Sequence, residues 1–136
     1  RFKTKNNGPS TKAVGDAAEN AALAHLQAAG LRLVARNFRT PGWGGGEIDL
    51  IMREPGGTLV FVEVRRRKSA SHGGAAASVG AIKQRRIIFA ARHYLMRLAS
   101  TPPCRFDVVV VQGDANGHQA LPSLDWIRAA FDASDN

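Results

Sequence analysis

The sequence predicts an α/β fold in which a mixed β-sheet is flanked by helices, with the core order helix, strand, strand, strand, helix, strand. Three observations lead to this prediction. Apolar residues recur at three- and four-residue steps in two long segments, which is the helical period. Four shorter segments are rich in Ile, Leu and Val and are bounded by turn residues, as strands are. The length of 136 residues suits one domain with its own core, so we expect a flexible basic tail at 1–11 and a single domain at 12–136.

The first helix is predicted at 12–29, where a stripe of mostly small residues recurs at helical spacing. The stripe consists of Gly15, Ala18, Glu19, Ala22, Leu26 and Ala29. Ser10 or Thr11 can cap the start of this helix, and Gly30 can end it. The segment from Leu31 to Phe38 then predicts the first strand.

Two further strands are predicted at Glu47–Arg53 and Leu59–Arg67, after the glycine-rich loop Thr40–Gly46. The residues Glu54-Pro55-Gly56-Gly57 between them are a strong turn signal, so we expect an antiparallel hairpin. Alternate side chains of a strand point to opposite faces. One set is apolar and is expected to point together into the core: Ile48, Leu50, Val62 and Val64.

The second helix is predicted from Ser78, which can cap it, to about Leu98. Its expected core-facing stripe consists of Val79, Ile82, Ile87, Ala90, Ala91, Tyr94, Leu95 and Leu98. Pro102-Pro103 prevents its continuation. A valine-rich buried strand is predicted at Arg105–Gln112, and a final helical turn or two around 126–131.

The charge of the chain bears on its partner. Nineteen Lys and Arg face eleven Asp and Glu, which gives a formal net charge of +8 and favours a polyanionic partner, either nucleic acid or an anionic membrane surface. The longest apolar runs fall far short of the ~20 residues of a spanning helix, and no signal peptide is visible, so we expect no membrane partner. The single cysteine, Cys104, excludes an internal disulfide and indicates a reducing cytoplasm.

The hairpin carries the residues that point to chemistry. Glu47 and Asp49 are two residues apart and share one face of their strand, and Glu63 and Arg65 share a face of the next strand. If Asp49 lies opposite Glu63, the loop between the strands is Glu54 to Thr58, which agrees with the turn signal. The two carboxylates would then stand about 5 Å apart at Cβ.

Two such carboxylates repel each other by about 4 kcal/mol at an effective dielectric constant of 20, so they need a proton or a cation between them. Hard oxygen ligands on a rigid hairpin suit Mg²⁺ or Mn²⁺, which could activate a water molecule and offset charge on a phosphate. We expect Asp49, Glu63 and Glu47 to provide the metal ligands. Glu19 can join them if the first helix packs on this part of the sheet. The alternative is a solvated acidic face that forms surface salt bridges to Arg65, Arg67 or Arg53.

A rim of basic residues is expected around these acids. It consists of Arg66, Arg67 and Lys68 at the end of the hairpin, and of Lys83, Arg85 and Arg86 in the first turns of the second helix. Exposed N–H groups at that helix terminus also suit phosphate. Trp43 in the glycine-rich loop can stack on an exposed base, although a loop tryptophan also folds back onto its own domain. A basic run that simply solvates one face is the alternative.

The runs Gly46-Glu47-Ile48-Asp49-Leu50-Ile51 and Phe61-Val62-Glu63-Val64-Arg65 resemble the split Asp…Glu-x-Lys motif of restriction-endonuclease-like nucleases. More closely, residues 12 to 132 resemble the uncharacterised YraN-like bacterial family. The other landmarks are Gly15 and Glu19, Gly73-Gly74-Ala75-Ala76-Ala77-Ser78 with Lys83-Gln84, Arg105-Phe106-Asp107-Val108-Val109, and Trp126-Ile127 with Ala130-Phe131. The resemblance implies a restriction-endonuclease-like core in a nuclease-like domain, and relatedness to Holliday-junction resolvases, which often work as homodimers.

Carried over to this chain, the motif implies Asp49 as the central metal ligand and Glu63 as the second. Glu19 would be the acid that some members add from the first helix, and Glu47 an outer ligand. Arg65 occupies the place of the motif lysine. An arginine stays protonated and cannot accept a proton from water, although it can clamp a phosphate.

Three functions are therefore expected in turn. The first is a Mg²⁺- or Mn²⁺-dependent nuclease, with Asp49, Glu63, Arg65 and Glu19 as catalytic residues and DNA favoured over RNA. The second is a nucleic-acid-binding domain with a degenerate nuclease fold. The third is a domain whose basic face meets an acidic protein.

Overall fold

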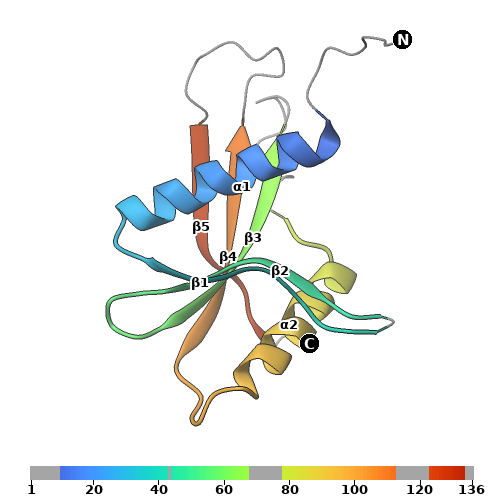
Figure 1. The fold of residues 1–136 in the computed structure, drawn as a ribbon, viewed down its shortest axis with the longest axis vertical. Helices are drawn as coiled ribbons and strands as arrows, with labels where there is room; N and C mark the ends of the chain where they lie inside the picture. The colour runs from blue at the N-terminus through green and yellow to red at the C-terminus, as the bar shows by residue number, and fades with distance from the viewer. Residues whose placement is uncertain (1–9, 43, 68–77, 113–122, 134–136) are drawn as a thin grey trace, which may run out of the picture.

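The structure, a computed structural model, describes residues 10–42, 44–67, 78–112 and 123–133. Residues 1–9 of the predicted tail lie outside this part. The elements in chain order are α1 (Thr11–Ala28), β1 (Arg32–Arg39), β2 (Glu47–Arg53), β3 (Leu59–Arg67), α2 (Ala81–Leu95), β4 (Cys104–Gln112) and β5 (Ser123–Phe131). The predicted mixed α/β fold with flanking helices is confirmed, and β5 extends its sheet (Figure 1). Neither helix in the described part of the chain is long and apolar enough to cross a membrane.

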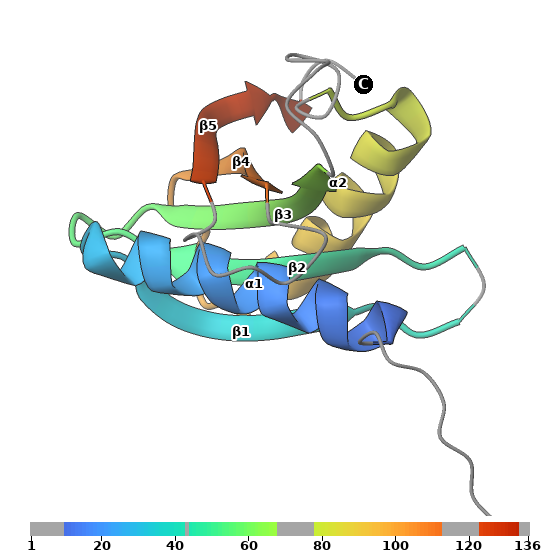
Figure 2. The same cartoon turned by 90° about the horizontal axis from the view of Figure 1, so that it is seen from above.

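The five strands form one sheet in the order β1-β2-β3-β4-β5, which Figure 2 shows from its side. Strands β1 and β2, β2 and β3, and β4 and β5 pair antiparallel, whereas β3 and β4 are parallel. A parallel pair needs a crossover connection, and α2 lies in that connection. The sheet is therefore mixed, as the sequence predicts.

Helices pack on both faces of the sheet. Ala18, Ala22 and Leu26 of α1 share a buried cluster with Leu50, Met52, Val60, Val62, Val109 and Val111. Ile87, Ala90 and Ala91 of α2 share a second cluster with the alternate residues Ile51, Leu59, Phe61 and Phe106. Burial on both faces leaves the strands nearly continuous in apolar residues.

One expectation about the hairpin faces is wrong. Leu50, Val62 and Val64 pack on the α1 side, but Ile48 packs with the α2 cluster. The alternation of side chains is thus broken between Ile48 and Leu50. Asp49 lies at this break, near the end of β2 where its pairing with β3 stops.

The helix ends agree in part with the sequence. The Ser10 hydroxyl accepts a hydrogen bond from the Ala13 N–H at 3.0 Å, which confirms the predicted cap of α1. The predicted cap of α2 at Ser78 is wrong, because α2 begins at Ala81 with Gly80 as its N-cap. Ile82 was expected in the core, but it lies on the outer side of α2 and is exposed.

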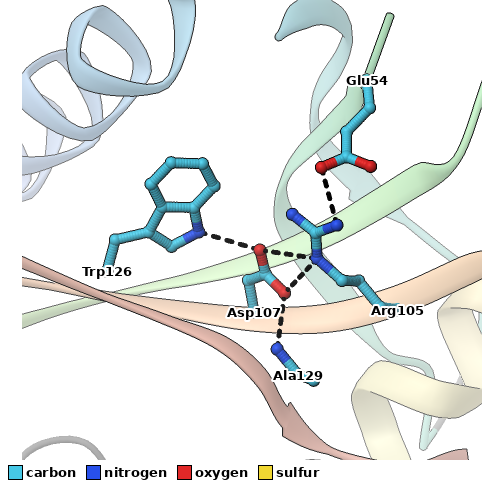
Figure 3. A network of polar contacts seen from close by, with 5 residues as sticks. All are labelled: Glu54, Arg105, Asp107, Trp126 and Ala129. Carbon is cyan, nitrogen blue, oxygen red and sulfur yellow. Dashed lines mark hydrogen bonds and ion pairs between the residues drawn. The ribbon is translucent and has the colours of Figure 1, made fainter. Parts of the chain in front are cut away.

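The helical turns predicted around 126–131 are wrong, because these residues belong to β5. The reason lies in Asp107 of β4, which is fully buried and needs hydrogen-bond donors (Figure 3). Trp126 Nε1 donates to Asp107 at 2.8 Å, and the N–H of Ala129 donates at 2.9 Å. Arg105 Nε completes the set at 2.9 Å, which confirms the expected salt bridge between Arg105 and Asp107. The network extends through Arg105 Nη1 to Glu54 in the β2–β3 turn, 2.7 Å away.

Candidate functional site

The site lies where β2 and β3 separate. The paired residues run from Leu50↔Val62 to Arg53↔Leu59, and the turn is closed by a bond from the Glu54 N–H to the Thr58 carbonyl. This register brings Asp49 to the level of Glu63, as the turn signal predicts. Beyond it, β3 stays paired only with β4, and Figure 1 shows β2 leaving the direction of β3.

Asp49 lies against the backbone of β3 in the gap. Its Oδ2 accepts a hydrogen bond of 2.8 Å from the N–H of Val64, a donor that would otherwise pair with a neighbouring strand. The carboxylate therefore sits beside Glu63, the residue before Val64. Burial raises the pKa of Asp49 from 3.8 to about 7, with the nearby charge of Glu63 as the next cause. The charges of Glu19 and Glu47 also raise it, which places all four acids around one point.

Glu63 is the buried acid of the site, and its partner comes from α2. The Glu63 side chain is only 6% exposed, and its Oε2 lies 3.1 Å from Nζ of Lys83. Lys83 is half exposed at the start of α2, so its ammonium group faces both the acid and the solvent. The sequence suggested Lys83 as part of a phosphate-binding rim, but gave no sign of this contact.

Glu19 and Glu47 each have an arginine partner from β1. Arg36 Nη2 lies 3.2 Å from Glu19 Oε1, and Arg39 Nε lies 3.5 Å from Glu47 Oε2. Sequence reasoning missed both arginines. A signal existed for the second pair, because Arg39 and Glu47 flank the Thr40–Gly46 loop and face each other in the β1–β2 register.

Arg65 does not contact the acids. Its Nη1 donates to the carbonyl oxygen of Ser78 at 3.0 Å. Arg53 donates to the Gly57 carbonyl, and Arg67 binds Gln112 and Asp125. The alternative of surface salt bridges from these three arginines to the acids of the site is therefore not what the structure shows.

The acids fit a divalent ion as a two-carboxylate site. Among the described residues no group of three or more His, Cys, Asp or Glu is arranged to hold a metal. Mg²⁺ usually takes one or two protein carboxylates and keeps several waters, so Asp49 and Glu63 provide the donor chemistry it prefers. Glu47, expected as a third ligand, is drawn to Arg39 and is not grouped with them.

The basic rim is partly described. Arg86 lines a cavity of about 450 Å³ together with Gly42, Gly44 and Gly45 of the β1–β2 loop. Gly46 packs so closely on the carbonyl of Arg86 that a Cβ there would overlap it. Arg66 and Arg85 are exposed. Trp43 and Lys68 lie outside the described residues.

Comparison with known proteins gives a consistent result. A model of the uncharacterised protein family UPF0102 matches residues 18–111. A UPF0102 protein of Polaromonas naphthalenivorans is 68% identical over 125 residues, which cover 91% of this chain and 82% of that protein. UPF0102 proteins of Paracidovorax citrulli and Albidiferax ferrireducens are 67% and 65% identical, each over 90% of this chain and over 85% and 90% of their own lengths.

Proposed function

Since the chain belongs to the uncharacterised protein family UPF0102, whose name states no activity, we propose its function from the site itself. We propose a Mg²⁺- or Mn²⁺-dependent nuclease that hydrolyses phosphodiester bonds, preferably in DNA. One observation carries the proposal: the Asp49 carboxylate lies against β3 beside the buried Glu63, with Val64 as its backbone donor. The resemblance of these strands to the split nuclease motif supports it further.

Asp49 and Glu63 would hold the divalent ion. Such an ion lowers the pKa of water and offsets negative charge on a phosphate. Asp49 is suited to this because its hydrogen bond to Val64 fixes the carboxylate while leaving Oδ1 available. Glu63 is held in place by burial. Glu19, at 15% exposure and paired with Arg36, would act from behind them by holding Arg36 near the acids.

The cation that serves the phosphate is proposed to be Lys83. Its Nζ already reaches the acid pair at Glu63 Oε2, whereas Arg65 is directed to Ser78. A lysine ammonium is a compact charge with three donors, so it can contact a carboxylate and a phosphate oxygen together. Arg65 would bind the nucleic-acid backbone farther along β3.

The backbone of nucleic acid would extend from the acids across α2 and the β1–β2 loop. Arg86 and the backbone of Gly42, Gly44 and Gly45 line a concave surface there. Phosphate contacts of this kind fix the orientation of nucleic acid without reading its sequence. The net charge of +8 favours the approach of any such strand.

Purified protein tests the proposal when it is incubated with Mn²⁺ or Mg²⁺ and with duplex, single-stranded and branched DNA and with RNA. Cleavage of at least one substrate is expected, with loss in EDTA and in Asp49→Ala or Glu63→Ala. Asp16→Ala is the matched control, because it removes an exposed acid of α1 that pairs only with Lys12 in the described structure. No cleavage of any substrate, or equal cleavage by Asp49→Ala, would refute the nuclease.

A nucleic-acid-binding domain without cleavage is the second candidate. It is favoured by the arginine at position 65 and by the protein cations that already neutralise Glu19, Glu47 and Glu63. This candidate predicts affinity that falls steeply with salt concentration, because bound phosphates release counterions. Asp49→Ala would leave that affinity unchanged or strengthen it.

A further inference from the structure

The outer side of α2 carries a row of exposed apolar side chains. Ile82, Phe89 and Met96 are 64%, 44% and 74% exposed, and they follow one another at seven-residue spacing. Residues seven apart lie almost above one another on a helix, so the three form one line about 21 Å long. The opposite side of α2 is already buried against the sheet through Ile87, Ala90 and other residues. The core therefore does not account for this row.

Basic residues border the row on both sides. The helical angle of 100° per residue places Arg85 and Arg92 along one edge, and Arg86 and His93 along the other. Within Ala81–Leu95 no residue is acidic. Neither Arg85 nor Arg92 has an ion-pair partner among the described residues. The surface is thus a narrow apolar line between two uncompensated positive edges.

We infer that this surface, formed by Ile82, Phe89 and Met96 with Arg85 and Arg92, binds an acidic amphipathic helix of a partner protein. A helix lays a line of apolar residues along such a row, and acidic residues beside that line would meet the arginines. The inference does not rest on nuclease activity, because the residues that approach the acids, Lys83 and Arg86, lie on another side of α2.

Other occupants fit the same surface less well. A second copy of the chain would set arginine against arginine across the interface, which costs free energy. A lipid surface requires a broad apolar face, whereas this row is one residue wide. Nucleic acid would pair with the arginines but would leave Ile82 and Met96 exposed.

The test uses a labelled synthetic peptide of 21 residues (about six helical turns) with leucine at the first and fourth positions of each heptad and glutamate beside them. Fluorescence anisotropy with the full chain should show saturable binding. Phe89→Ser combined with Met96→Ser should weaken it about tenfold or more, and so should Arg85→Glu combined with Arg92→Glu. Leu33→Ser is the control, because it removes an exposed apolar side chain from β1 and should leave binding unchanged.

Circular dichroism of each variant establishes that its fold is kept. No binding of the acidic peptide, or equal binding of a peptide with lysine in place of glutamate, would overturn the inference. Three parallel measurements test the other occupants: sedimentation of the chain alone, binding to phosphatidylglycerol vesicles, and binding to a single-stranded oligonucleotide. A dimer, a vesicle complex or an oligonucleotide complex that Phe89→Ser combined with Met96→Ser disrupts would also overturn it.

Discussion

Lys83 Nζ lies 3.1 Å from Glu63 Oε2, so the cation that meets the buried acid of β3 comes from α2 and not from Arg65 on the same strand. The motif lysine that Arg65 replaces along the sequence thus has a spatial counterpart on another element. This contact joins the start of α2 to the end of the hairpin, which is where β2 and β3 separate.

Replacement of Lys83 by methionine should affect cleavage far more than binding. We expect kcat to fall about 100-fold, because the phosphate loses the charge placed next to Glu63, while DNA affinity changes about twofold. Arg85→Met is the matched control, since it removes a positive charge from the other side of α2. Single-turnover cleavage and anisotropy measure the two quantities, and a Lys83→Met protein that cleaves like the wild type would contradict the assignment.

Asp49→Asn should stabilise the metal-free protein as the pH rises. The pKa of Asp49 is about 7 in the folded state against 3.8 as its ordinary value, so the unfolded chain loses this proton first. The resulting penalty on the wild-type fold starts near pH 4, grows to pH 7 and is constant above. Asparagine keeps an oxygen for the Val64 N–H and has no charge.

Urea unfolding in EDTA measures this effect. Between pH 5 and pH 8 the stability advantage of Asp49→Asn over the wild type should grow by about 2 kcal/mol. Asp16→Asn, at an exposed position of α1, should show no such trend. A pH-independent difference between Asp49→Asn and the wild type would mean that Asp49 is not held in a buried, acidic environment.

Gly46→Ala should destabilise the protein by about 2 kcal/mol, because its Cβ would overlap the carbonyl of Arg86 and the loop would have to move off α2. Gly56→Ala in the β2–β3 turn is the control, since a Cβ there meets nothing within 4 Å. Thermal unfolding compares the two variants. Equal melting temperatures would show that the loop does not pack on α2 as described.

Removal of the Asp107 carboxylate should be more damaging. Asp107→Ala leaves Arg105 and Trp126 Nε1 without their acceptor in the core, so we expect a loss of about 3 kcal/mol or more. Trp126→Phe, which removes one of the donors, should cost about 1 kcal/mol for the lost hydrogen bond. Denaturant unfolding gives both values, and a smaller loss in Asp107→Ala than in Trp126→Phe would contradict the network.

Local sequence patterns predict much of this structure. Helical spacing and the residues around Ser10 locate α1, and the turn at 54–58 sets the hairpin register that brings Asp49 level with Glu63. These features depend on neighbours in the chain. The strand assignment of 123–131 could not be obtained in this way, because β5 depends on donors that it supplies to Asp107 on β4.

The site itself was predictable only in part. Alternation along a strand assigns Asp49 and Glu63 to their faces, but it does not show that the alternation breaks between Ile48 and Leu50. Nor does it place Lys83, because the position of α2 follows from how its apolar face packs on the sheet. The same packing leaves Ile82 outside the core, although its spacing in the sequence suggested burial.

The central claim is that Asp49 and Glu63 together hold a divalent ion. Crystals grown with Mn²⁺ and measured at a wavelength that gives manganese anomalous scattering test it most directly. The account predicts an anomalous peak in contact with a carboxylate oxygen of each residue, and no peak there in Asp49→Asn. Crystals that contain Mn²⁺ elsewhere, with Glu63 still bound to Lys83 and no peak beside Asp49, would contradict it.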